Sequence, residues 1–254
     1  MSRGLGDVYK RQALNYATPV GLMGGEPYRI MELTPYVGAS KATSSVILYV
    51  MMHIFSHFCF WFFSIFLYLA LRPVDIAMGT ILAVVGAVSL LAIYFFMKGY
   101  KNGMAVRTLK LLQHIPFVKE WAKRFSENKR EALERVDSQI AELHKQRRST
   151  FYASLSLEFM ARIIGCLEVY FILNILTTDV SFPACILIMA FTSLFANLFF
   201  FSPMQLGARE GGFALAVGGL AIPGAFGVYT GLITRVRESV SYTHLRAHET
   251  LANL

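Results

Sequence analysis

The stretch VILYVMMHIFSHFCFWFFSIFLYLAL, Val46–Leu71, contains no Lys, Arg, Asp or Glu in its 26 residues. A helix needs about 20 consecutive apolar residues to cross a lipid bilayer. An uncharged run of this length therefore predicts a membrane-spanning helix. It also sets the fold class, because other segments of the chain repeat the same pattern.

Three more runs reach this length, and two shorter runs follow them. The clear runs are Val46–Leu71, Ile76–Met97, Phe151–Leu176 and Pro183–Phe201, and the partial ones are Phe213–Ile222 and Ala225–Ile233. Hydrophobic residues make up 55% of the chain, which excludes an ordinary soluble domain. The sequence predicts an all-α, polytopic membrane helix bundle with four clear spans and two partial ones.

Two short segments resemble each other, Thr18–Glu26 and Ser202–Glu210. Each begins with a hydroxyl residue and a proline, and each ends with a glutamate seven positions after that proline. Both carry glycine and adjoin apolar runs. Paired segments that are broken by glycine and proline are typical of substrate sites in membrane transporters. The pair predicts two broken or re-entrant motifs that flank the main spans.

The segment Lys98–Thr150 is strongly basic and holds 13 of the 24 Lys and Arg residues. Positively charged loops stay in the cytoplasm, and alternating the spans from this loop places both motifs on the cytoplasmic side. We expect 98–150 to form a helical hairpin that attracts anionic lipid, and we expect no nucleic-acid partner. A hairpin that packs beneath the bundle is the alternative.

The sequences at the two ends of the chain indicate a sequencing artefact. Codons for Asp7–Gln12, read on the opposite strand, encode Val240–His244, and the string resembles a transposon adapter. We therefore expect residues 1–12 and 239–254 to be adapter-derived, and 13–238 to be a membrane domain truncated at both ends.

Glu26 and Glu210 are the first candidates for a functional site, because a carboxylate within a membrane bundle needs a cation or water. Arg29 lies three residues after Glu26, and Arg209 directly precedes Glu210. Neighbouring glycines free backbone amides to face an anion such as a lipid phosphate. The alternative is an ordinary capped turn with glutamate in the first turn of a helix.

Charged residues also interrupt the span Phe151–Leu176. Glu158 and Arg162 are four residues apart and predict an ion pair on one helix face, whereas Glu168 lies on another face. Such charges mark a substrate pathway or a structural clamp between helices.

Little in the chain indicates catalysis or a cofactor. His53 and His57 have the spacing of a metal pair, but no third ligand accompanies them, so hydrogen bonding inside the bundle is the favoured interpretation. Cys59, Cys166 and Cys185 lie in apolar runs as small hydrophobes. We expect no metal, no cofactor and no catalytic residue, and an enzyme is the less favoured interpretation.

Both motifs resemble the signatures of the lysylphosphatidylglycerol synthase transmembrane region, or flippase-like, family. The first signature matches residues 19–29 followed by Ala39–Ala42, and the second matches Pro203 with Gly207–Gly211, although Gln205 stands where glycine is common. The resemblance implies an all-helical bundle that moves aminoacylated phosphatidylglycerol across the membrane. Relatives that make this lipid add a soluble domain, which is not evident here.

The leading hypothesis is a multi-pass protein of the bacterial inner membrane that binds or translocates phospholipid. The alternatives are a membrane scaffold or regulator, and the membrane half of an aminoacyl-lipid synthase. The predicted lipid path comprises Pro19, Gly21, Gly24, Gly25, Glu26, Arg29, Glu158, Arg162, Ser202, Pro203, Gly207, Arg209, Glu210 and Gly211.

Overall fold

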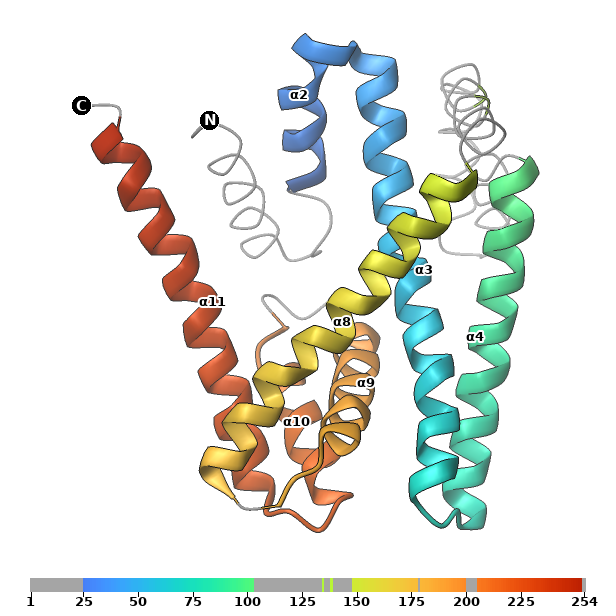
Figure 1. Cartoon of the computed structure of the whole chain (residues 1–254), viewed down its shortest axis with the longest axis vertical. Helices are drawn as coiled ribbons and strands as arrows, with labels where there is room; N and C mark the ends of the chain where they lie inside the picture. The colour runs from blue at the N-terminus through green and yellow to red at the C-terminus, as the bar shows by residue number, and fades with distance from the viewer. Residues whose placement is uncertain are drawn as a thin grey trace. The chain divides into compact units, whose positions relative to one another are not determined.

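The computed structural model describes residues 25–102, 134, 138, 148–177, 179–199 and 205–252, and every regular element in these ranges is α-helical. This confirms the predicted fold class. The helices shown in Figure 1 are α2 (Gly25–Val37), α3 (Ala39–Leu71), α4 (Ile76–Asn102), α8 (Arg148–Leu176), α9 (Phe182–Leu198), α10 (Ala208–Gly218) and α11 (Gly224–Ala252).

Three of these helices are long and apolar enough to cross a membrane. They contain the first three predicted spans and run over Ala39–Leu71, Ile76–Lys98 and Ser149–Leu176. The fourth predicted span, Pro183–Phe201, corresponds to α9, which has 17 residues and is thus only about 25 Å long. The prediction of a fourth clear span was therefore too long, since Leu198 ends the helix and Phe199 caps it.

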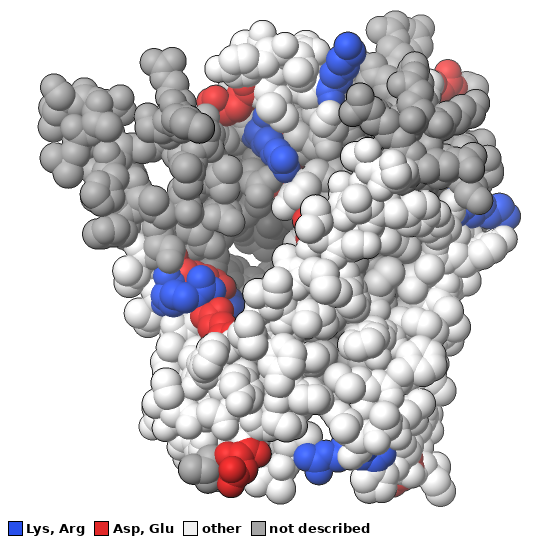
Figure 2. Space-filling model, in the orientation of Figure 1, with Lys and Arg blue, Asp and Glu red and all other residues white. Residues whose placement is uncertain are grey.

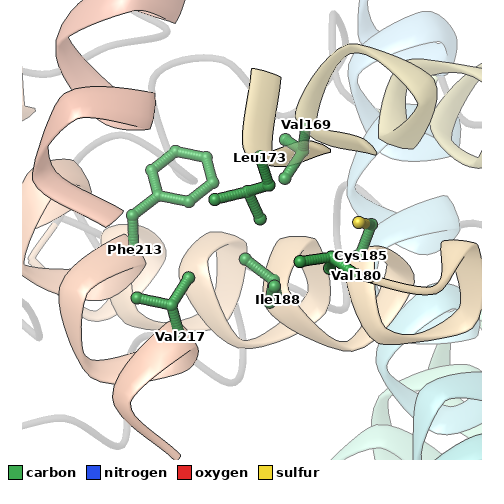
Figure 3. Packing of buried hydrophobic residues seen from close by; sticks show 7 residues of the cluster. All are labelled: Val169, Leu173, Val180, Cys185, Ile188, Phe213 and Val217. Carbon is green, nitrogen blue, oxygen red and sulfur yellow. The ribbon is translucent and has the colours of Figure 1, made fainter. Parts of the chain in front are cut away.

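The chain divides into two compact units, and α2, α3 and α8 contribute to both. The first unit contains α9, α10, α11 and the part of α8 from Met160 onward. Its core is made by three of these helices, and Figure 3 shows Phe213 of α10 pointing toward Leu173 of α8. The buried members are Val169, Leu173, Val180, Cys185, Ile188, Phe213 and Val217.

The second unit contains Leu33–Phe62 and Ile76–Phe159. Its core joins α3, α4 and the beginning of α8 through Met52, Phe55, Phe96 and Phe151. The rings of Phe55 and Phe96 stack with their centroids 4.2 Å apart. Stacked aromatic pairs of this kind add to the free energy of burial, so they fix α4 against α3.

Glycines allow α10 to pack closely on both of its neighbours. A Cβ atom at Gly212 would lie 3.3 Å from the Thr192 Cα atom of α9. On the α11 side, a Cβ atom at Gly227 would lie 2.5 Å from the Phe213 carbonyl oxygen. Small residues at such points let helix backbones approach in membrane proteins, where packing replaces the hydrophobic effect. The short helix α10 is therefore held between α9 and α11.

The connection from α8 to α9 is held by one amide side chain. Asn174 donates to the backbone oxygens of Tyr170 at 2.9 Å and Val180 at 3.0 Å, and its Oδ1 atom accepts from the Val180 amide at 3.3 Å. Ser181 then caps α9 by accepting from the Ala184 amide. The backbone groups of Val180 and the first turn of α9 therefore have partners within the protein.

Replacing Asn174 with alanine should lower the free energy of unfolding by about 2 kcal/mol, because Val180 loses both bonds while its backbone stays partly buried. Thermal unfolding in detergent would measure the change. The control is Asn197→Ala, which removes an exposed bond to the Ser193 oxygen of the same helix. Equal effects of the two substitutions would contradict the assigned role of Asn174.

Candidate functional site

The second motif forms the beginning of α10. Gly207 precedes the helix with a φ of 79°, a left-handed conformation that glycine adopts without steric cost. Its amide donates to Glu210 Oε2 at 3.0 Å, and its carbonyl accepts from the Gly211 amide at 2.8 Å. Glu210 thus caps its own helix, as the capped-turn alternative expects.

Glu210 also forms an ion pair with α11. Its Oε1 atom lies 2.7 Å from Arg235 Nε and 2.6 Å from the nearest terminal nitrogen of that guanidinium. The side chains of Glu210 and Arg235 are only 13% and 14% exposed. Gly231 makes this approach possible, because a Cβ atom there would lie 3.2 Å from the Glu210 Cα atom. Both carboxylate oxygens of Glu210 therefore have partners inside the protein.

Arg209 pairs with a different glutamate of α11. One terminal nitrogen of its guanidinium donates to both Glu238 oxygens, at 2.9 and 2.8 Å. Both side chains are partly buried. Arg209 and Glu210, which are neighbours in the second motif, thus pair with two residues of α11. Their partners Glu238 and Arg235 lie about one turn apart on that helix.

A third arginine joins α11 to α8. The Nε atom of Arg237 donates to Glu168 Oε1 at 2.5 Å, and another nitrogen of the same group lies 3.7 Å from Glu238 Oε1. Arg237 is the most exposed of the three arginines, at 54%.

We call the resulting group of six residues the charge cluster. Figure 2 shows basic and acidic side chains side by side at the level of α11. Its formal charges cancel, since it holds three arginines and three glutamates. The members are Glu168, Arg209, Glu210, Arg235, Arg237 and Glu238.

Much of the first motif lies outside the described residues, including Pro19, Gly21 and Gly24, as do Ser202 and Pro203 of the second. Gly25 begins α2, and Glu26 is buried in its first turn. Arg29 follows one turn later on the same helix. Most of the basic segment 98–150 also lies outside the described residues, so its predicted hairpin stays a prediction.

Glu158 and Arg162 lie on α8, but Glu158 belongs to the second unit, whereas Arg162 belongs to the first. Glu158 contacts His53 of α3, with its Oε2 atom 3.4 Å from the Nδ1 atom of the ring. The side chain of His57 packs edge-on against that ring, at 5.2 Å between centroids. Among the described residues, no group of three metal-ligating side chains comes together.

Four members of the charge cluster were absent from the predicted lipid path: Glu168 of α8, and Arg235, Arg237 and Glu238 of α11. For the three on α11 a usable signal was present, because small residues recur at helical intervals immediately before them: Gly224, Gly227, Thr230, Gly231 and Thr234. Such a stripe predicts close helix packing, and charges that follow it must then meet partners on the neighbouring helix.

Comparison with known proteins identifies the type of membrane domain. The family model described as "Lysylphosphatidylglycerol synthase TM region" matches residues 1–243. No curated protein and no solved structure matches the chain.

Proposed function

Because the chain belongs to the lysylphosphatidylglycerol synthase TM region family, we propose that it binds a phospholipid headgroup at the charge cluster and moves the lipid between leaflets. The chain is a membrane protein, with three helices of sufficient length and apolarity to span a bilayer. The proposal includes a multi-pass arrangement in a bacterial inner membrane, with the basic segment 98–150 on anionic lipid of the cytoplasmic face.

The observation that carries the proposal is the position of Arg209. One nitrogen of its guanidinium bonds both oxygens of the Glu238 carboxylate, yet the pair is not fully buried, since the two side chains are 22% and 19% exposed. Guanidinium binds phosphate oxygens as well as it binds carboxylate oxygens. A phosphate can therefore replace Glu238 as the partner of Arg209.

Exchange of partners would also lower the electrostatic cost of moving a charged headgroup through a membrane. A charge in the hydrocarbon region is costly unless it is paired. In the charge cluster, Glu238 also lies near Arg237, which can compensate the carboxylate when a phosphate takes Arg209. Glu238 then keeps a cation nearby while the headgroup enters.

Glu210 and Arg235 have a different role in this proposal. Their pair is more buried, and Glu210 already caps α10. They hold α10 on α11 and thereby orient Arg209, while Glu26 and Arg29 of α2 supply a second polar group for the headgroup.

The test is movement of fluorescent phosphatidylglycerol between leaflets of vesicles that contain the full chain. Arg209→Gln should slow the movement at least 10-fold, because it removes the phosphate partner and leaves Glu238 without its closest cation. The matched control is Arg72→Gln, which removes an exposed arginine from the turn between α3 and α4.

Three outcomes would contradict the proposal: no movement with the wild-type chain, equal loss in both variants, or unchanged rates in Arg209→Gln. A chain that binds the lipid without moving it would instead support the scaffold alternative.

A further inference from the structure

A second polar site lies outside the charge cluster, between α3 and the first half of α8. It consists of His53 and Glu158, which both belong to the second unit. Both residues lie within helices that are long and apolar enough to cross a membrane. The proposed path for the headgroup at the charge cluster makes no use of this pair.

His53 and Glu158 lie at the same distance from the C-terminal ends of their helices. His53 and Glu158 each lie 18 residues before the end of their helix, at Leu71 and Leu176. This corresponds to about 27 Å of helix beyond the contact, whereas the helices begin about 21 Å (α3) and about 15 Å (α8) before it. The pair therefore lies inside both candidate membrane spans and away from the ends of either helix.

The contact joins two ionisable groups, an imidazole and a carboxyl group. The distance from His53 Nδ1 to Glu158 Oε2 is 3.4 Å, and the side chains are 39% and 27% exposed. The pair is electrically neutral when it holds a single proton, as imidazolium with carboxylate or as imidazole with carboxylic acid. One added proton makes it positive, and loss of its proton makes it negative.

Other titratable groups lie on the elements that contain the pair or pack against it. On α3, the Tyr49 ring stacks on His53 at 6.2 Å, and His57 contacts it from the next turn. On α8, Arg162 follows Glu158 by one turn. The helix α4 packs on the same core through Phe96, and its Lys98 donates to Tyr94 of its own helix.

We propose that His53 and Glu158 form a proton-binding site that couples proton entry to the working cycle of the protein. A proton from water on the more acidic side adds to the pair and gives imidazolium beside carboxylic acid. Release of a proton to the other side restores the neutral pair, so one proton crosses for each cycle and no other group changes. Acid and histidine side chains within membrane helices form proton relays in pumps and transporters.

A structural clamp between α3 and α8 would use the same contact, so the test must first show that the pair binds a proton and then that this proton affects lipid movement. The first measurement is therefore the NMR titration of histidine side chains in the full chain, labelled with ¹⁵N-histidine and held in lipid nanodiscs. Loss of one signal in His53→Gln assigns that residue. We expect the His53 signal to titrate in the wild-type chain and its midpoint to change in Glu158→Gln, because the ring loses the carboxyl group that lies 3.4 Å away.

Glu158→Asp keeps the charge at a shorter reach and should give an intermediate midpoint, which protects the test against misfolding of Glu158→Gln. His57 serves as the internal control, since it contacts His53 but is one turn further along α3, and its midpoint should move less. A His53 signal that does not titrate between about pH 4 and pH 9, or a midpoint that Glu158→Gln leaves unchanged, overturns the proposal.

The second measurement is lipid movement in vesicles with an imposed proton gradient. Wild-type movement should change at least threefold with the gradient, whereas Glu158→Gln should be insensitive to it. A gradient without effect on the wild-type rate overturns the coupling. If labelled lipid does not move at all, the proposed transport fails, while the NMR titration still decides whether the pair binds a proton.

Discussion

Gly227→Ala should lower the unfolding temperature by roughly 10 °C, the largest effect we expect from a single added methyl group. The new Cβ atom would lie 2.5 Å from the Phe213 carbonyl oxygen, 2.6 Å from its carbonyl carbon and 2.7 Å from the Ala214 Cα atom. All three are backbone atoms, so no side chain can rotate away. The helices α10 and α11 must separate, at a cost of about 3 kcal/mol.

Separation of these helices would also disturb the site. Gly231 lies one turn further along α11 and packs against Glu210, so a shift of α11 withdraws Arg235 from its carboxylate. The substitution should therefore reduce the proposed lipid movement as well as stability.

Thermal unfolding can be followed with a thiol-reactive dye, because Cys166 and Cys185 are buried and become reactive only when the first unit opens. Gly165→Ala is the matched control, since its Cβ atom would meet nothing within 4 Å on α8. This control should be neutral or slightly stabilised, because alanine favours a helix more than glycine does. Similar unfolding temperatures for the two variants would show that α10 and α11 do not approach as described.

The second large effect is expected from Arg235→Gln, which should cost about 3–5 kcal/mol of stability. It leaves Glu210 with the Gly207 amide as its remaining described partner, while the carboxylate stays 13% exposed. Arg237→Gln is the comparison, because that arginine is 54% exposed and pairs exposed to solvent contribute about 1 kcal/mol or less.

A double-mutant cycle that adds Glu210→Gln separates the interaction energy of the pair from the other effects of each substitution. The double variant should lose clearly less than the sum of the single variants, with a coupling energy of about 2 kcal/mol, because neither partner is then left charged and alone. Additive losses would show that Glu210 and Arg235 do not depend on each other.

The fold was predictable where a single apolar pattern determined it. The uncharged run 46–71 and the runs after it predicted α3, α4 and α8, since a bilayer requires a minimum length of apolar helix. The shorter elements were harder to predict. The helix α10 begins at Ala208, before the apolar stretch that was predicted from Phe213, because Glu210 and Gly207 cap it through polar contacts rather than through hydrophobicity.

Only the local part of the candidate site was predictable from the sequence. The second motif pointed to Arg209 and Glu210 through their spacing and neighbours. Their partners Glu238 and Arg235 lie 29 and 25 residues away, and only the packing of α11 on α10 selects them. The contact between His53 and Glu158 joins residues 105 positions apart. A charge in an apolar run indicates that a partner exists, but it does not identify which one.

The cancelling charges of the cluster have a consequence for the response to membrane voltage. A potential of 100 mV performs about 2.3 kcal/mol of work on each elementary charge that crosses the membrane. Three arginines and three glutamates that move together carry no net charge, so the voltage performs no net work on them. In the proposed transport, any voltage dependence then reports the charge of the lipid and of a proton that crosses with it.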